Sequence, residues 1–152
     1  MELPSVAQLI PVLQTAIGPV ILISGIGLLL LTMTNRLGRA IDRARILVGT
    51  LPSTTEAKGE KTVAQLRILW ARARMIRLAI ALASVSALAA AILIIALFST
   101  ALWQIGSAWI IVVLFMVSMV SLIGSLVVFI RDINQSLAAL KLELSAEEIV
   151  DF

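Results

Sequence analysis

Three apolar runs, residues 12–33, 78–98 and 108–130, contain no Lys, Arg, Asp or Glu. Each run is long enough to cross a hydrocarbon core roughly 30 Å thick, which takes about 20 helical residues. Backbone polar groups in lipid must be satisfied within their own segment, so the runs predict helices rather than strands. Of the 152 residues 61% are hydrophobic and 14% charged, whereas soluble domains are about half apolar and a quarter charged. We expect an all-α integral membrane protein with three transmembrane helices, forming a single membrane domain over residues 1–152.

The basic residues predict how the chain is oriented in its membrane. Ten of the 12 lie in segment 34–77, between the first two runs, and the other two follow the third run. Loops rich in Lys and Arg stay on the cytoplasmic side. This pattern predicts an N-terminus outside, with segment 34–77 and the tail 131–152 in the cytoplasm. Trp103 and Trp109 flank the short outer loop, where an aromatic belt is expected. With no Cys, a bacterial inner membrane is the expected location.

Segment 34–77 has apolar residues at helical spacing on both sides of a central stretch with turn residues, Gly49, Pro52 and Gly59. The first helix is therefore predicted to continue to about Val48, and the second to begin at about Glu60. The two would pack as an antiparallel cytosolic hairpin. With ten basic and three acidic residues, the segment has a net charge of +7.

The tail 131–152 is predicted to form an amphipathic helix with one apolar stripe, composed of Ile133, Leu137, Leu140 and Leu144. Ser145 followed by Glu148 has the spacing of a capping box, which predicts a break and a last short helical turn. Two basic and five acidic residues give the tail a net charge of −3. Opposite charges could draw the tail onto the hairpin, within a subunit or between subunits; a solvated acidic end is the plain alternative.

An arginine-rich stretch follows the first run directly and contains Arg36, Arg39, Arg43 and Arg45. Asp42 lies three residues from Arg39 and from Arg45, within pairing reach on a helix. Basic residues near a membrane surface attract anionic lipid at about 1 kcal/mol each. Orientation alone is the simpler interpretation of the same charges. The candidate contacts for an anionic headgroup or an acidic partner are Arg43, Arg45, Arg72, Arg74 and Arg77.

Small and hydroxyl-bearing residues form a face on each predicted span. Such faces let helix backbones approach closely, which drives association in lipid, and they predict a homo-oligomer. The candidate packing residues are Ala79, Ala83, Ala87, Ala91, Ser118, Ser121 and Ser125. The first run carries a row that could instead line a pore: Gly18, Gly25, Thr32, Asn35, Arg36 and Arg39. Rings of arginine in a pore would select anions.

Several functional classes are not expected from this composition. With no His and no Cys, the usual zinc, haem and iron–sulfur ligand sets are missing, and so are the catalytic Cys–His pair and the Ser–His–Asp triad. We expect no metal, no cofactor and no enzymatic activity. Proton-coupled carriers use acidic or histidine side chains within their spans, and none is present. The basic surface could attract nucleic acid, but anionic lipid is nearer, so no nucleic-acid partner is expected.

The stretch 30–47, Leu-Leu-Thr-Met-Thr-Asn-Arg-Leu-Gly-Arg-Ala-Ile-Asp-Arg-Ala-Arg-Ile-Leu, has a distinctive arginine pattern. It is followed by a second arginine-rich helix that leads into two further spans. The pattern resembles a bacterial membrane family, domain of unknown function 2721, over roughly residues 10 to 140. The resemblance implies membership and the membrane fold, and it implies no activity and no site residue.

Two functions are compatible with these features. One is a homo-oligomeric ion channel or small-solute pore with a basic cytoplasmic vestibule, which needs several subunits because three helices cannot enclose a useful pore. The other is a non-conducting membrane scaffold or regulatory subunit, whose basic hairpin binds anionic lipid or an acidic partner. Binding of the hairpin to anionic liposomes that weakens as ionic strength rises would favour the second function.

Overall fold

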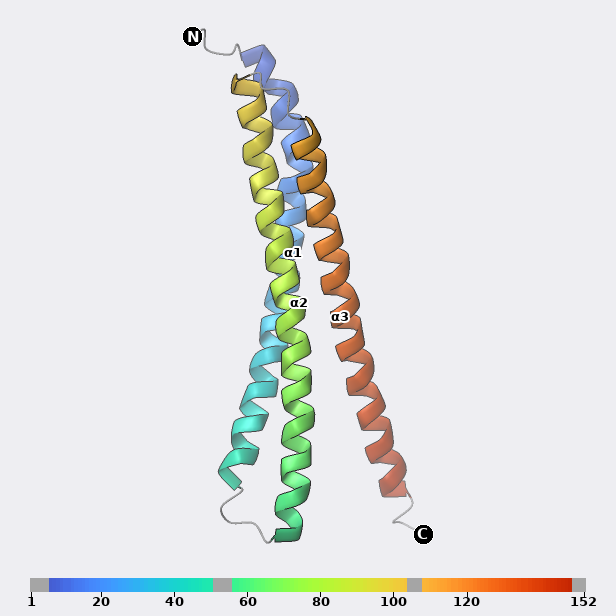
Figure 1. The fold of residues 1–152 in the computed structure, drawn as a ribbon. Helices are drawn as coiled ribbons and strands as arrows, with labels where there is room; N and C mark the ends of the chain where they lie inside the picture. Colours follow the sequence, from blue (N-terminus) through green and yellow to red (C-terminus); the bar gives the residue numbers. More distant parts are fainter. Residues whose placement is uncertain (1–5, 51–55, 104–107, 149–152) are drawn as a thin grey trace. The chain divides into compact units, whose positions relative to one another are not determined.

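The computed structural model describes the backbone of residues 6–50, 56–103 and 108–148, and side-chain surroundings at 10–49, 59, 62–102 and 108–135. The described backbone forms three helices, α1 (Val6–Thr50), α2 (Glu56–Trp103) and α3 (Ala108–Glu148) (Figure 1). Each contains a stretch long and apolar enough to cross a membrane. The prediction of an all-α fold with three membrane-spanning helices is confirmed.

The helix boundaries differ little from the predicted ones. α1 ends two residues later than predicted, and α2 begins four residues earlier. Pro11 and Pro19 both lie inside α1, where the Thr15 hydroxyl donates a hydrogen bond to the Pro11 carbonyl at 2.9 Å. Both amphipathic extensions therefore continue their spans as single helices.

The predicted break near Ser145 is wrong, because α3 continues without interruption to Glu148. The eight residues before Ser145 are Leu-Ala-Ala-Leu-Lys-Leu-Glu-Leu. All of them are strong helix formers, with no Gly or Pro to end the helix. Capping-box spacing alone does not overcome that preference. The side chains of this segment, including most of the predicted apolar stripe, and that of Trp103 lie outside the described residues.

The chain divides into two compact units. We call residues 1–32 with 80–125 the apolar unit, and residues 33–79 with 126–152 the charged unit. In the charged unit the α1 and α2 parts run antiparallel as a hairpin (Figure 1). Among the described side chains of this unit, those of Met33, Ile76, Ala79 and Asp132 are fully buried, and Asp132 is the polar one.

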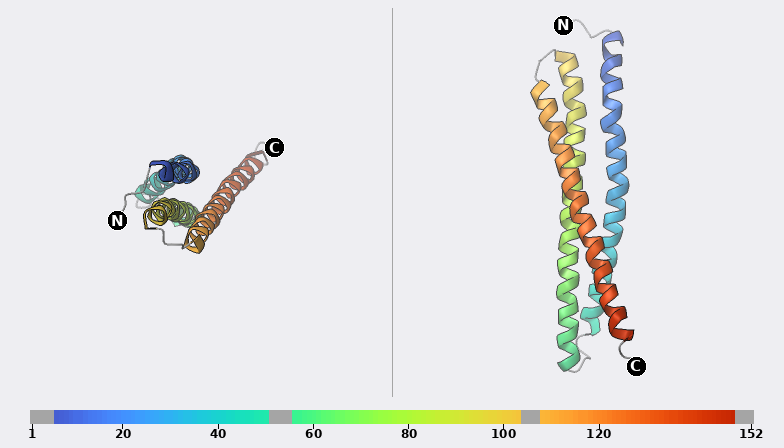
Figure 2. Two further views of the ribbon diagram at one scale, coloured as in Figure 1. Left: turned by 90° about the horizontal axis from the view of Figure 1, so that it is seen from above. Right: turned by 90° about the vertical axis from the view of Figure 1, so that its right-hand side faces the viewer.

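In the apolar unit small residues hold the helices together. The α2 and α3 parts lie next to each other (Figure 2), and Ser86 and Ser118 bind one another across this contact. The Ser86 hydroxyl donates to the Ser118 carbonyl at 2.8 Å, and the Ser118 hydroxyl donates to the Ser86 carbonyl at 3.0 Å. Backbones can approach this closely only where side chains are small. Among the residues of this unit whose side-chain surroundings are described, the buried ones are Ala16, Ile26, Ala83, Ser86, Ala89, Ala90, Leu93, Ser118 and Ser125.

Most of the large apolar side chains are exposed. Of the most apolar stretches of α1, α2 and α3, 17%, 33% and 11% are buried within the chain. A soluble monomer rarely exposes so much contiguous apolar surface. Lipid, or other chains within lipid, must therefore cover the remainder.

Candidate functional site

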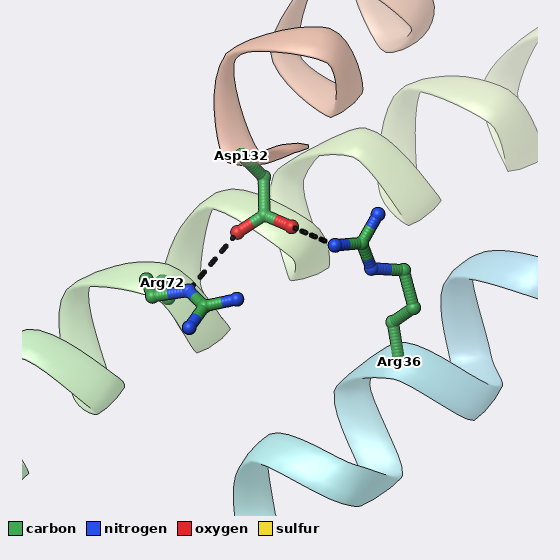
Figure 3. Close-up of polar contacts among 3 residues, drawn as sticks. All are labelled: Arg36, Arg72 and Asp132. Carbon is green, nitrogen blue, oxygen red and sulfur yellow. Dashed lines mark ion pairs between the residues drawn. The ribbon is translucent and has the colours of Figure 1, made fainter. Parts of the chain in front are cut away.

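The charged unit contains a carboxylate placed between two arginines, one from each hairpin helix. Asp132 on α3 pairs with Arg36 on α1, Oδ2 to Nη2 at 3.7 Å, and with Arg72 on α2, Oδ1 to Nε at 3.6 Å (Figure 3). The Arg36 guanidinium also lies over the Phe129 ring, 5.4 Å from its centre. We call Arg36, Arg72 and Asp132 the ion-pair cluster. It ties α3 to both helices of the hairpin.

The burial of this cluster is uneven. The Asp132 side chain is 0% exposed, whereas those of Arg36 and Arg72 are 23% and 28% exposed. A buried carboxylate is costly unless opposite charges and hydrogen bonds compensate it. Two cations compensate one anion here, so the cluster keeps one net positive charge. The two arginines extend that charge toward the surface of the unit.

The hairpin also carries an apolar groove with a volume of about 770 Å³. Apolar side chains of α1 and α2 form its walls, and three arginines, Arg45, Arg74 and Arg77, lie among them. Trp70, a large aromatic side chain, is 75% exposed. The combination suits a ligand with both an apolar face and negative charge. The lining residues are Leu37, Ala40, Ile41, Ala44, Arg45, Val48, Leu66, Leu69, Trp70, Ala73, Arg74 and Arg77.

The groove opens on the side of the hairpin away from Asp132. Successive helical residues are turned by about 100°. On α1, Ile41 is therefore turned about 140° from Arg36, and on α2, Trp70 is turned about 160° from Arg72. Because both arginines face Asp132, the exposed wall of the groove faces nearly the opposite way. The ion-pair cluster and the groove are two separate features of the charged unit.

The five arginines predicted to contact lipid or a partner lie in three different environments. Arg45, Arg74 and Arg77 line the groove. Arg72 is instead paired with Asp132, and Arg43 is exposed outside the groove. Asp42 is exposed, and no ion pair joins it to Arg39 or Arg45, all three being described residues.

The row predicted to line a pore is largely exposed. Five of its residues are exposed: Gly18, Gly25, Thr32, Asn35 and Arg39. A Cβ atom built at either glycine would meet nothing within 4 Å. The sixth residue, Arg36, is half-buried in the ion-pair cluster. Whether the row lines a pore stays a prediction.

The predicted packing residues are buried to different degrees. Ala79, Ala83, Ser118 and Ser125 are buried, and Ala87, Ala91 and Ser121 are half-buried. The buried row of α2 alternates steps of three and four residues, through positions 76, 79, 83, 86, 90 and 93. Positions spaced three and four residues apart in this way lie on the one face of a helix that packs against a neighbouring helix, which we call the seam.

Two residues of importance were missed in the sequence, Ser86 and Asp132. Ser86 belongs to the three-and-four alternation on α2. On α3 the buried polar residues Ser118, Ser125 and Asp132 recur every seven residues, which places them on one face. This spacing of seven residues is the sequence pattern from which the buried face of α3 could have been predicted.

Within the described part of the chain, no group of three or more His, Cys, Asp or Glu could hold a metal ion.

Three apolar helices and a charged helical unit define a multi-pass membrane protein. The chain belongs to the family described as "Protein of unknown function (DUF2721)", whose model matches residues 16–142. This confirms the family resemblance inferred from the arginine-rich stretch. Searches of curated proteins and of solved structures find no match to the chain.

Proposed function

We propose that the protein is a membrane-anchored scaffold or regulatory subunit of the bacterial inner membrane. Its hairpin receives an acidic amphipathic helix on the cytoplasmic side. The observation that carries this proposal is the groove, in which an apolar floor is combined with Arg45, Arg74 and Arg77.

The chemistry of the groove favours a helix as its ligand. An amphipathic helix binds by placing apolar side chains, spaced three and four residues apart, into a groove between two other helices. Covering the exposed Trp70 and Ile41 gains about 25 cal/mol per Å² of apolar surface. The arginines then favour a helix with acidic residues beside its apolar stripe over one with basic residues there. Opposite charges attract and promote association, whereas like charges oppose it.

The proposal is tested with the full chain in nanodiscs of zwitterionic lipid and two helical peptides. The peptides share one apolar stripe, and one has an acidic polar face while the other has a neutral one. We expect the acidic peptide to bind more tightly, with an affinity that falls as salt screens the charges. Arg74→Gln and Trp70→Ala should weaken binding, whereas Arg43→Gln, outside the groove, should not. Equal binding by all variants would contradict the proposal.

Anionic lipid is the competing ligand for the same arginines. Replacing part of the zwitterionic lipid by anionic phospholipid introduces headgroups near the surface, where each basic residue contributes about 1 kcal/mol. If anionic lipid abolishes peptide binding, and native mass spectrometry shows lipid retained only by chains with Arg74 intact, the groove is a lipid site.

A homo-oligomeric pore is the second candidate, and one observation favours it. Five residues of the α1 row are exposed and could face neighbouring subunits: Gly18, Gly25, Thr32, Asn35 and Arg39. Gly25→Leu should leave the fold of one chain intact, because nothing lies within 4 Å of its Cβ position, while changing subunit number. Native mass spectrometry measures the subunit number, and liposome flux with Arg39→Glu measures selectivity. A monomer or dimer would exclude an axial pore.

A further inference from the structure

We infer that the partner of the groove is a second copy of this chain, whose α3 segment 133–148 lies in it. This inference rests on the proposed function of the groove and names its ligand. Three observations carry it: the axial levels of the groove and the segment, the face on which the groove opens, and the charges of both surfaces.

The ion-pair cluster marks one level along all three helices of the charged unit, since Asp132 contacts both Arg36 and Arg72. From Arg36, the apolar residues of the α1 wall lie one, four, five, eight and twelve positions further on, namely Leu37, Ala40, Ile41, Ala44 and Val48. From Asp132, the apolar stripe predicted in the sequence of α3 has four of these five offsets, at Ile133, Leu137, Leu140 and Leu144. α1 and α3 run in the same direction (Figure 1).

The α3 helix of the same chain is held on the other side of the hairpin. Asp132 is fixed against Arg36 and Arg72, and the exposed groove wall at Ile41 and Trp70 is turned about 140–160° from them. One helix cannot keep the ion pairs and fill the groove. A second copy can supply the segment, because a shared membrane holds both copies at one depth and raises their effective concentration.

The charges of the two surfaces are complementary. Segment 34–77 has a net charge of +7, and the tail 131–152 has −3. Arg45 lies nine positions beyond Arg36 and lines the groove, and Glu143 lies eleven positions beyond Asp132 in sequence. The two residues would therefore lie at levels about 3 Å apart along the helix axes. Both segments lie on the same side of the membrane, because two spans separate them.

The test uses disulfide trapping, for which the chain is well suited because it has no cysteine. One chain carries Ile41→Cys, and a second, distinguished by a size tag, carries Leu137→Cys; both are co-expressed in membranes and mildly oxidised. A disulfide forms only where Cα atoms approach within about 7 Å. We expect a mixed dimer of the two sizes. The matched control replaces Ile41→Cys with Ile46→Cys, which is 69% exposed but does not line the groove.

Exchanging the charges of Arg45 and Glu143 between the two chains distinguishes a loss of docking from a loss of folding. Arg45→Glu in the chain with Ile41→Cys should lower the yield of mixed dimer about fivefold, the equivalent of roughly 1 kcal/mol. Adding Glu143→Arg to the chain with Leu137→Cys should restore the yield. A misfolded variant cannot be rescued by a change in its partner.

Two results would overturn the inference. One is a mixed-dimer yield no higher than that of the control pair. The other is an intrachain disulfide in the double variant, Ile41→Cys with Leu137→Cys, in nanodiscs that hold a single copy, because the chain's own tail then reaches its groove. The peptide-binding assay distinguishes these failures from failure of the proposed function: a groove that still binds the acidic peptide has another partner.

Discussion

Asp132 joins all three helices of the charged unit through its ion pairs with Arg36 and Arg72. It is fully buried, and its two arginine partners come from helices far apart in sequence. An aspartate two residues beyond an apolar run reads, in sequence, as an ordinary membrane-boundary charge. Its role depends on Arg36 and Arg72 reaching it, and that proximity is a property of the fold.

Asp132→Asn should destabilise the protein by about 2 kcal/mol, because it leaves two cations without their counterion. Breaking a fully buried ion pair costs about 3–5 kcal/mol of stability. The loss here should be smaller, because the two arginine side chains are 23% and 28% exposed and can reach water. Unfolding in detergent measures the change. Arg39→Gln, at an exposed residue, is the control, and equal stability of the two variants would contradict the assigned role.

At the scale of the elements, the contact between α2 and α3 is specified by two serines. Each hydroxyl donates to the carbonyl of the other residue, and the two hydroxyl oxygens lie 3.2 Å apart. The acceptors are backbone atoms, which remain when a side chain is removed. The two hydrogen bonds are therefore nearly independent of each other.

Ser86→Ala and Ser118→Ala should each cost about 0.6 kcal/mol, the average for a hydrogen bond between helices in a membrane. The double variant should show a nearly additive loss, with a coupling energy below about 0.5 kcal/mol. Ser84→Ala is the matched control, since that hydroxyl bonds to Ile80 of its own helix. A coupling above 1 kcal/mol would show that the contact between the two hydroxyls dominates.

The helices themselves could be predicted from the sequence, because apolar runs of span length and amphipathic extensions are local patterns. Which faces of these helices are buried could be predicted only in part. A stripe of Ala at every fourth residue indicated Ala79 and Ala83, but the seam follows alternating steps of three and four and includes Ser86. Which face of a small-residue helix is buried depends on its neighbours. The groove could not be predicted either, since it needs residues of two helices in register.

At the scale of the whole molecule, apolar surface and charge are separated along the chain. The exposed apolar side chains of the spans require lipid, and segment 34–77 holds ten of the 12 basic residues. The positive-inside pattern is the basis for placing that segment in the cytoplasm.

The orientation is testable with single cysteines in an otherwise cysteine-free chain. In intact cells, a membrane-impermeant maleimide should label Ser107→Cys in the predicted outer loop. It should spare Ile46→Cys in the hairpin until the membrane is permeabilised, because charged reagents do not cross lipid. Labelling of Ile46→Cys in intact cells would reverse the orientation and move the groove to the outer face.

The groove opens on the side of the hairpin away from Asp132, so in the proposed contact between copies the surface that donates a helix differs from the surface that accepts one. Contacts of this head-to-tail kind propagate: successive subunits either close into a ring or continue as an open array. In the proposed assembly, an open array would have one vacant groove and one unused α3 segment at its ends, whereas a ring would have neither. A chain with Leu137→Glu and Leu140→Glu would accept a neighbour without donating, and traces of it would shorten every array that it joins.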